Sequence, residues 1–242
     1  MKGVVLAGGL GTRLYPLTKV TNKHLLPVYD KPMVFYPITT LVKAGIKDIV
    51  VVTGGPYSGH FISILKNGKE LGIKHLEYAY QENEGGIADA LYLAKDFVGR
   101  DSCTVILGDN TTDYDITNDV KSFKKGAMIF IKQVPDPERF GVPIFDENNT
   151  DLIKEIVEKP KNPPSNFAVT GLYIYDSEVF RVASKLKPSQ RGELEITDVN
   201  NYYAKSGQLK FKKLKGFWHD TGTFDHLLEA SIFWARKAGV KV

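Results

Sequence analysis

Short hydrophobic runs alternate along the chain with longer segments in which apolar residues recur at helical spacing. Because the short runs are rich in β-branched residues and nearly continuous, they are typical of strands buried on both faces of a sheet. In the first half of the chain the predicted strands are Gly3–Ala7, Asp48–Thr53, Cys103–Leu107 and Ala127–Ile131. Helices are predicted between them at Met33–Ala44 and Ile87–Phe97, each ending close to a glycine that suits a helix C-terminus.

The second half combines two further strand patterns, Ile153–Val157 and Phe167–Tyr175, with helical patterns at Leu194–Lys205 and Phe224–Ala238. Strands that alternate with helices are typical of an α/β domain with a parallel sheet. We therefore predict an α/β fold with a mostly parallel central sheet flanked by helices, to which the second half adds a layer. The alternative is two domains with a boundary near Pro135–Pro137, although hydrophobic runs continue on both sides of it.

Composition is that of an ordinary folded protein: 43% of the 242 residues are hydrophobic and 25% are charged, so disorder and coiled coil are poor interpretations. The net charge of +4 does not require a nucleic-acid partner. The single cysteine, Cys103, excludes an internal disulfide and a Cys-rich zinc site, and it favours a reducing, cytoplasmic compartment. No apolar stretch approaches the ~18 residues of a transmembrane helix, so no membrane partner is expected.

A glycine-rich segment, Gly8-Gly9-Leu10-Gly11-Thr12-Arg13, follows the first predicted strand directly. Glycines at a strand end let backbone N–H groups come close to phosphate oxygens, because no Cβ holds the ligand away. A P-loop motif is absent, and a dinucleotide fingerprint would need a third glycine where Leu14 stands. The loop, with the cations of Arg13 and Lys23, therefore suits the phosphates of a nucleoside triphosphate.

Further motifs extend over nearly the whole chain. They are Asn22-Lys23-His24-Leu25-Leu26-Pro27-Val28, Leu107-Gly108-Asp109-Asn110, Glu158-Lys159-Pro160, Thr170-Gly171-Leu172-Tyr173, Arg191-Gly192-Glu193-Leu194-Glu195-Ile196-Thr197-Asp198 and Asp220-Thr221-Gly222-Thr223. Together with the glycine-rich loop they resemble the signature of the sugar-1-phosphate nucleotidyltransferases. Within that family the match is closest to the thymidylyltransferase branch, which uses dTTP and glucose 1-phosphate.

The resemblance implies a single Rossmann-like domain over residues 1–242, with a nucleotide-binding part at about 1–115 and an added sugar-binding layer at about 116–225. The implied reaction is Mg²⁺-dependent transfer of a nucleotidyl group from dTTP to glucose 1-phosphate, by in-line attack of the sugar phosphate, giving dTDP-glucose and pyrophosphate. Longer relatives continue beyond the last predicted helix, so we expect a short form whose feedback control is absent or built differently. A homo-oligomer is also expected.

The same resemblance assigns candidate roles to residues of this chain. The residues expected to bind the nucleotide are Leu6, Gly8, Gly9, Gly11, Thr12, Arg13, Gln81, Gly86 and Asp109. The residues expected to bind the sugar phosphate are Gly141, Glu158, Lys159, Val169 and Tyr173. The expected catalytic cations are Arg13, Lys23 and Lys159. The expected magnesium ligands are Asp109 and Asp220, since Mg²⁺ is usually held by one or two carboxylates together with substrate phosphates.

Two positions depart from the thymidylyltransferase pattern. The carboxamide of Gln81 offers an acceptor and two donors, which can match the N3–H and O4 of thymine or uracil. Asp89, however, stands where relatives usually carry Gln, and it affects base preference if it contacts the nucleotide. Phe140 replaces the more usual Tyr before Gly141 in the expected hexose pocket.

No motif for a base-activated nucleophile is present, and none is required, because a sugar phosphate with a second pKa of about 6 is already largely ionised at neutral pH. A UTP-using uridylyltransferase is an alternative, since uracil presents the same pairing edge as thymine. A non-catalytic sensor of sugar nucleotides would be expected to lose one of four charged residues. All four, namely Arg13, Asp109, Lys159 and Asp220, are present.

Overall fold

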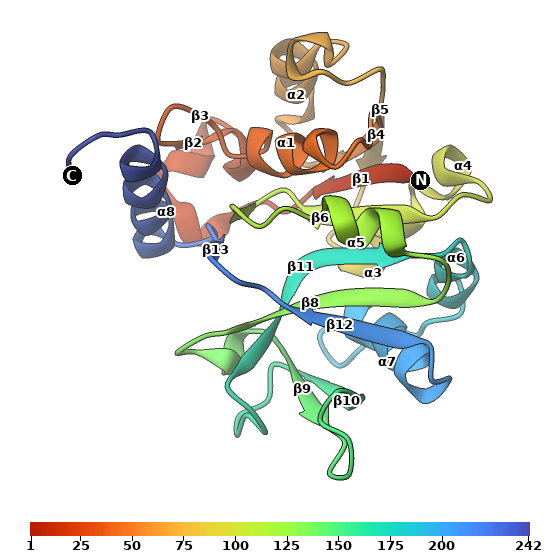
Figure 1. Ribbon diagram of the computed structural model, residues 1–242. Helices are drawn as coiled ribbons and strands as arrows, with labels where there is room; N and C mark the ends of the chain where they lie inside the picture. Colours follow the sequence, from red (N-terminus) through yellow and green to blue (C-terminus); the bar gives the residue numbers. More distant parts are fainter.

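The computed structural model describes all 242 residues and is built around one seven-stranded sheet (Figure 1). The strand order across the sheet is β12 (Leu209–Lys213), β8 (Ala127–Gln133), β11 (Phe167–Tyr175), β6 (Cys103–Leu107), β1 (Lys2–Ala7), β4 (Asp48–Gly54) and β5 (His75–Gln81). Only β11 runs antiparallel to its neighbours, and every other pairing in this sheet is parallel. The predicted α/β fold with a mostly parallel central sheet is therefore confirmed.

Hydrophobic clusters cover both faces of this sheet. Along β1, Val4 and Leu6 join one cluster while Val5 and Ala7 join the other, as expected for side chains that alternate across a strand. The first cluster is completed by α3 (Ile87–Tyr92), α4 (Lys95–Val98), α6 (Glu178–Ala183) and α7 (Ile196–Lys205). The second is completed by α1 (Phe35–Lys43), α2 (Ser58–Leu65) and α5 (Thr117–Ser122). The central strands are thus buried on both faces, as their near-continuous hydrophobic runs predict.

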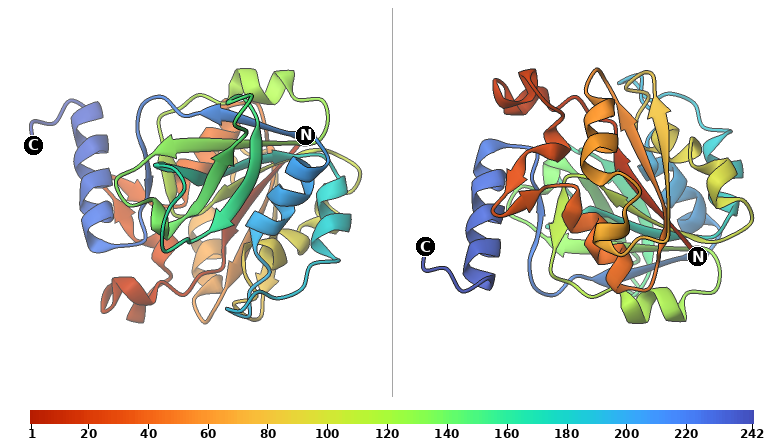
Figure 2. Two further views of the ribbon diagram at one scale, coloured as in Figure 1. Left: turned by 90° about the horizontal axis from the view of Figure 1, so that it is seen from below. Right: turned by 90° about the horizontal axis from the view of Figure 1, so that it is seen from above.

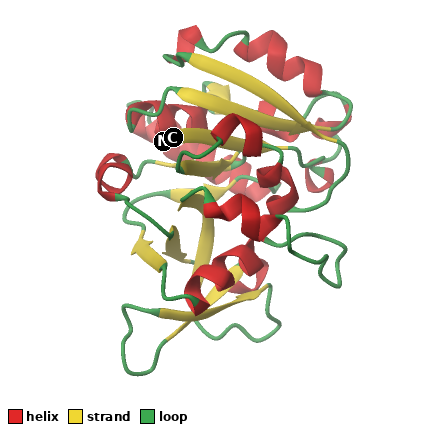
Figure 3. Ribbon diagram, turned by 90° about the vertical axis from the view of Figure 1, so that its right-hand side faces the viewer, coloured by secondary structure: helices red, strands yellow, loops and turns green.

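Three two-stranded ribbons lie outside the main sheet. They pair β9 (Gly141–Phe145) with β10 (Ile153–Glu158), β7 (Asn110–Thr112) with β13 (Trp218–Asp220), and β2 (Pro27–Val28) with β3 (Lys31–Pro32). The β9–β10 hairpin forms the bottom of the molecule in Figure 3. The last helix, α8 (Phe224–Lys237), stands at one end of the molecule beside the β2–β3 ribbon (Figure 2). No helix has the length and apolar character needed to cross a membrane.

Short 3₁₀ turns connect these elements at Thr12–Leu14, Leu17–Lys19, Lys23–Leu25, Lys69–Leu71 and Pro137–Arg139. Two of the differences from the predicted helix boundaries are explained by hydrogen bonds. The helix predicted over 87–97 is divided into α3 and α4, because the N–H of Ala94 donates to Leu91, three residues back, and tightens the chain between them. Helix α7 begins at Ile196, after Leu194, because the carbonyl of Leu194 already accepts from the N–H of Ala88 at 3.1 Å and so does not start the helical hydrogen bonds.

Candidate active site

Two adjoining cavities open beside the carboxyl ends of β1 and β6, where ligands usually bind in open α/β sheets. The first cavity has a volume of about 280 Å³ and the second about 480 Å³. Both are lined by Leu107 and Asp109 at the end of β6, and also by Glu84, Ile87 and Glu193. The candidate site is therefore one cleft with two compartments that meet at Asp109.

The first compartment collects most of the residues expected to bind the nucleotide. Its lining includes Leu6, Gly8, Gly9, Lys23, Gln81, Gly86 and Asp109. Gly8 approaches Gln81 so closely that a Cβ on residue 8 would lie 2.5 Å from Gln81 Oε1. The ring of His24 also lines this compartment and is neutral, because burial and the charge of Lys23 lower the pKa of His24 to about 3.

Gly11 and Thr12, also expected to bind the nucleotide, line neither compartment. Gly11 has a left-handed backbone with a φ of 69°, and a Cβ there would lie 2.6 Å from the Cβ of Lys23. The glycine therefore leaves room for the Lys23 side chain behind the loop. Thr12 begins the 3₁₀ turn that carries Arg13, and its side chain is exposed. Arg13 lines the second compartment and not the first. All the expected nucleotide contacts stay predictions.

The second compartment collects all the residues expected to bind the sugar phosphate. Its lining includes Gly141, Glu158, Lys159, Val169 and Tyr173. Glu158 lies opposite Gly141 in the β9–β10 ribbon and accepts a hydrogen bond from Thr197 Oγ1 at 2.5 Å. Tyr173 is buried, and burial together with the charge of Glu158 raises the pKa of its hydroxyl. The compartment thus offers an oriented carboxylate and a protonated phenol, both suited to sugar hydroxyls.

Lys159 has a backbone conformation that is unusual for a residue other than glycine, with a φ of 43°. Its N–H donates to the carbonyl of Phe140 at 3.0 Å, which ties the end of β10 to the residue before β9. Its ammonium lies 3.8 Å from Glu158 Oε1, and the side chain is 46% exposed. Residues in sparsely populated backbone conformations are common at ligand-binding sites, and this one places a cation at the edge of the second compartment.

A short ribbon brings Asp109 and Asp220 together although they are far apart in the sequence. The pairing of β13 with β7 sets Asp220 opposite Asn110, the neighbour of Asp109. Thr221 fixes this junction, because its N–H and its hydroxyl both donate to the carbonyl of Asp109, at 2.9 and 2.6 Å. Burial and the charge of Asp109 raise the pKa of Asp220, as expected for two buried carboxylates that lie close together.

Two of the expected catalytic cations flank this carboxylate pair. Lys23 Nζ lies 2.5 Å from Asp109 Oδ2. Burial by itself would raise the pKa of Asp109, but the ammonium of Lys23 outweighs burial and lowers that pKa below its usual range. The side chains of Arg13 and Asp220 approach each other beside Gly222. A Cβ on Gly222 would lie 2.8 Å from Asp220 Oδ1 and 2.9 Å from Arg13 Nη2, so both groups lie close to the same point. The charges of both carboxylates are therefore balanced by the chain itself.

The donor set at this junction fits a magnesium ion. Mg²⁺ prefers oxygen ligands and is usually bound by one or two carboxylates together with substrate phosphates. Asp109 lines both compartments and Asp220 lines the second, so phosphates in either compartment could complete the coordination. A divalent cation would also relieve the repulsion that raises the pKa of Asp220.

Sequence analysis missed the role of Asn110 in positioning Asp109. Asn110 Nδ2 donates to Asp109 Oδ1 at 3.0 Å. Asn110 Oδ1 accepts from the N–H of Gly171 at 3.0 Å and from Trp218 Nε1 at 2.8 Å. This buried amide, at the start of β7, therefore joins β7 to β11 and β13 beside the candidate metal ligand. Its place in the Gly108-Asp109-Asn110 motif is the only sequence signal that points to it.

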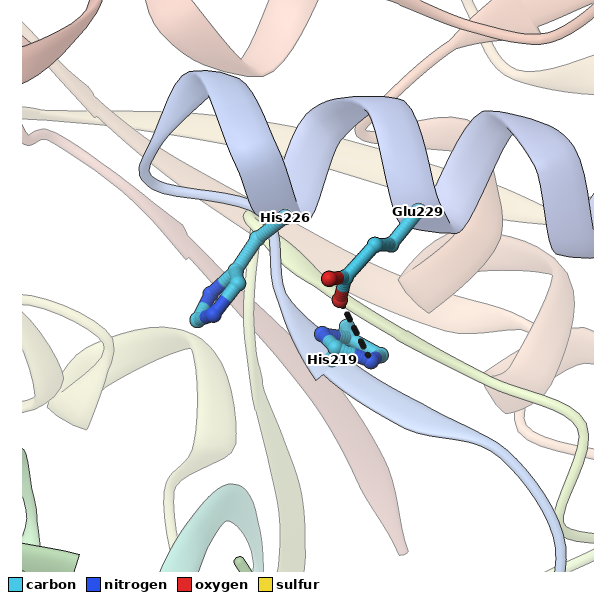
Figure 4. Close-up of side chains that lie close together, drawn as sticks. All are labelled: His219, His226 and Glu229. Atoms are coloured by element: carbon cyan, nitrogen blue, oxygen red, sulfur yellow. Dashed lines mark ion pairs between the residues drawn. The ribbon is translucent and has the colours of Figure 1, made fainter. Parts of the chain in front are cut away.

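A second missed group supports Asp220. His226 Nδ1 donates to the backbone carbonyl of Asp220 at 2.8 Å, and His226 Nε2 accepts from Arg139 Nη1 at 3.3 Å. Arg139 Nη2 lies 3.7 Å from Asp220 Oδ2 and is buried without a hydrogen-bond partner. Figure 4 shows His226 and Glu229 on α8 above His219, whose Nε2 lies 3.4 Å from Glu229 Oε2. These three side chains are metal ligands by type, but a guanidinium already holds His226 Nε2, so the cluster is better explained as support for Asp220.

Known proteins are similar to this chain over nearly its whole length. The nucleotidyl transferase family matches residues 2–237 of the chain. A glucose-1-phosphate thymidylyltransferase of Neisseria meningitidis is 46% identical over 239 residues, which cover 96% of this chain and 82% of the relative. A glucose-1-phosphate thymidylyltransferase of Mycobacterium tuberculosis is 44% identical over 250 residues, which cover 100% of this chain and 86% of the relative.

Two solved structures are also similar to this chain. A Bacillus anthracis protein assigned as a glucose-1-phosphate thymidylyltransferase, crystallised with sucrose, is 49% identical and superposes with a TM-score of 0.90, covering 96% of this chain and 94% of that protein. A UDP-glucose pyrophosphorylase in complex with UDP-glucose is 26% identical, with a TM-score of 0.83 and 98% of each chain covered.

Proposed function

The chain belongs to the nucleotidyl transferase family, and from this membership we propose that it transfers a thymidylyl group from dTTP to glucose 1-phosphate, forming dTDP-glucose and pyrophosphate. Relatives that share 44–46% of its residues over nearly the whole chain are named for this activity. The proposed substrates are accordingly two small phosphorylated molecules.

The observation that carries the proposal is the meeting of two compartments at Asp109. A nucleoside triphosphate in the first compartment would place its base near Gln81 and its phosphates along the glycine-rich loop, whose Gly8 and Gly9 line this compartment. Glucose 1-phosphate in the second compartment would place its hydroxyls near Glu158 and Tyr173. The two reacting phosphates would then meet where the cations are gathered.

In this arrangement the phosphate oxygen of glucose 1-phosphate forms a bond to the α-phosphorus of dTTP. The bond from that phosphorus to the bridging oxygen breaks, and its electron pair leaves with pyrophosphate. The attacking oxygen needs no general base, because the second pKa of a sugar phosphate is about 6. The task of the protein is to hold two anions together, for which positioning and fixed positive charge are the main means.

We assign Arg13 and Lys23 to the triphosphate and Lys159 to the sugar phosphate. Mg²⁺ would be held by Asp109 and Asp220, and when bound it would neutralise charge on the phosphates. The other proposed nucleotide contacts are Leu6, Gly8, Gly9, Gly11, Thr12, Gln81 and Gly86. The other proposed sugar contacts are Gly141, Glu158, Val169 and Tyr173.

These assignments divide one domain into a nucleotide-binding part at about 1–115 and a sugar-binding part at about 116–225. The division is supported by the origin of the two linings, since only the second compartment includes residues of β9 and β10. A cytoplasmic location is supported by the single free cysteine, Cys103. The homo-oligomer expected from the family resemblance stays a prediction.

The proposal is tested by incubating the purified protein with glucose 1-phosphate and each of dTTP, UTP, ATP, GTP and CTP, with MgCl₂ or with EDTA, and measuring pyrophosphate release. We expect rapid release with dTTP, slower release with UTP, little with the other three, and none with EDTA. Activity with dTTP that survives EDTA would remove the proposed metal. Activity with ATP or GTP above that with dTTP would reject the proposed nucleotide.

A UTP-using enzyme is the second candidate, because the chain also superposes on a UDP-glucose pyrophosphorylase over nearly its full length. Thymine and uracil differ by one methyl group, and a difference of that size is worth about 1–3 kcal/mol in an apolar pocket. The ratio of kcat/KM for dTTP and UTP is therefore expected to be modest. A ratio below one would move the proposal to uridylyl transfer.

A further inference from the structure

The carboxamide of Gln81 is held in one orientation at the end of the first compartment. Gln81 Nε2 donates to Asp89 Oδ2 at 2.7 Å and to the carbonyl of Gly86 at 3.2 Å. Both amide hydrogens are therefore used within the chain. Gln81 Oε1 faces Gly8, a Cβ on which would lie 2.5 Å from it. The group that Gln81 presents to a ligand is thus its acceptor oxygen alone.

The carboxylate of Asp89 enforces this orientation. An ionised carboxylate can only accept hydrogen bonds, so a Gln81 amide turned by 180° would set its oxygen against the two acceptor oxygens of Asp89 and Gly86. Asp89 reaches Gln81 from the first turn of α3, over Gly85, where a Cβ would lie only 2.6 Å from Asp89 Oδ2. An amide at position 89 would remove the stronger of these two constraints and leave only the Gly86 carbonyl, since an amide offers both a donor and an acceptor.

We propose that Asp89 is a specificity-determining residue that fixes Gln81 with its oxygen toward the base, so that the site selects pyrimidines with an N–H donor at N3. The inference rests on the proposed function, because it assumes that a pyrimidine nucleotide occupies the first compartment. Asp89 acts through Gln81 and is a positioning residue.

The hydrogen-bonding edges of the pyrimidines determine which bases this orientation of Gln81 favours. Thymine and uracil carry N3–H, which donates to Gln81 Oε1, whereas N3 of cytosine is an acceptor and would face that oxygen with a lone pair. Because both amide hydrogens of Gln81 are engaged, O4 of thymine needs another donor. The N–H of Gly86 has no partner within the chain and lines the same compartment. The base is therefore read by one side-chain acceptor and one backbone donor.

The test compares Asp89→Asn with the unchanged protein and with Asp96→Asn, a matched change on the exposed side of α4. Binding of dTTP and dCTP is measured by calorimetry, and kcat and KM for each are measured with glucose 1-phosphate. Calorimetry gives the selectivity without depending on turnover. Removing the negative charge of Asp89 could strengthen the binding of both triphosphates equally. The ratio of the affinities for dTTP and dCTP is not changed by such a uniform gain.

For Asp89→Asn we expect the preference for dTTP over dCTP to fall by about tenfold or more, because the amide of Gln81 can then turn to donate to N3 of cytosine. The fall should come mainly from KM, with kcat for dTTP retained, and the Asp96→Asn protein should keep the original ratio. An Asp89→Asn protein that is folded and keeps the original ratio in both measurements would overturn the inference. Clear selective binding without turnover would instead reject the proposed reaction and leave the inference standing, whereas failure to bind either nucleotide would reject both.

Discussion

The ammonium of Lys23 lies 2.5 Å from Oδ2 of Asp109, so the cation assigned to the triphosphate and the carboxylate assigned to the metal are paired with each other. Both side chains are largely buried, at 13% and 11% exposure. A divalent cation that binds Asp109 would compete with Lys23 for this carboxylate, and an ammonium released in this way would become available to a phosphate. The same ion pair explains why the pKa of Asp109 is lowered, although burial by itself would raise it.

Lys23→Met is expected to destabilise the protein and to make its stability more responsive to magnesium. Removing one partner of a buried ion pair costs about 3–5 kcal/mol, because the other charge is left uncompensated. Bound Mg²⁺ would restore compensation at Asp109 without competing against an ammonium. Tm measured with increasing MgCl₂ should rise more for the variant than for the unchanged protein or for Lys19→Met, an exposed control. Equal responses in all three proteins would contradict the exchange between Lys23 and metal.

Asp109→Asn and Asp220→Asn should each lower kcat by about 100-fold or more while the fold is retained, because a metal supplies several kcal/mol of charge stabilisation at the transition state. Steady-state turnover at saturating MgCl₂ gives the effect, and circular dichroism checks the fold. Asp225→Asn, an exposed change on the first turn of α8, is the matched control. A near-normal kcat in either of the first two variants would remove that residue from the metal site.

Lys159→Ala should raise KM for glucose 1-phosphate, and Arg13→Ala should raise KM for dTTP. Each change removes one charge-assisted hydrogen bond to a phosphate, worth about 1.5–3 kcal/mol, so each KM should rise by about tenfold or more. Initial rates measured with one substrate varied and the other saturating separate the two effects. Lys161→Ala, which removes an exposed cation two positions away, should leave both values unchanged. Similar defects toward both substrates in both variants would show that the two cations do not divide the phosphates in this way.

Gly8→Ala should weaken the use of dTTP without affecting glucose 1-phosphate. The new methyl group would lie 2.5 Å from Gln81 Oε1 and would displace the oxygen assigned to the base. Gly8 does not have a positive φ, so the effect comes from the contact and not from the backbone. Gly59→Ala on α2, where nothing lies within 4 Å, should be neutral or stabilise by about 0.5–1 kcal/mol. Calorimetry of dTTP binding to both variants checks this, and unchanged affinity in Gly8→Ala would move the base away from Gln81.

Sequence patterns predict the parts of this molecule that are dictated locally. The runs at 3–7 and 103–107 become β1 and β6 because continuous hydrophobic residues require burial on both faces. The glycine-rich loop lies at the candidate site because it follows the carboxyl end of β1 directly. Strand β12 was not predicted, since its sequence, Leu-Lys-Phe-Lys-Lys, is that of a lysine-rich edge strand with little hydrophobic signal.

These patterns did not predict the contacts between segments that are distant in the sequence. Strands β7 and β13 have three residues each, too short for a periodic signal, yet their pairing brings Asp220 to Asp109. The orientation of Gln81 depends on Asp89, and a sequence shows neither the direction of an amide nor its partner. Asp89 was recognised as a departure from the family pattern, but only the contact gives that departure a physical meaning.

The β7–β13 ribbon also limits where the chain can change length. Successive side chains of a strand point to opposite faces, so a slip of β13 by a single residue would turn Asp220 away from Asp109. Residues 214–217 lead directly into β13, so inserting or deleting one of them would shift the strand in this way. The tip of the β9–β10 hairpin, at 146–152, is exposed over most of its length and could lengthen without changing the register at either carboxylate. Insertions and deletions should therefore be tolerated at the hairpin tip and abolish turnover next to the ribbon.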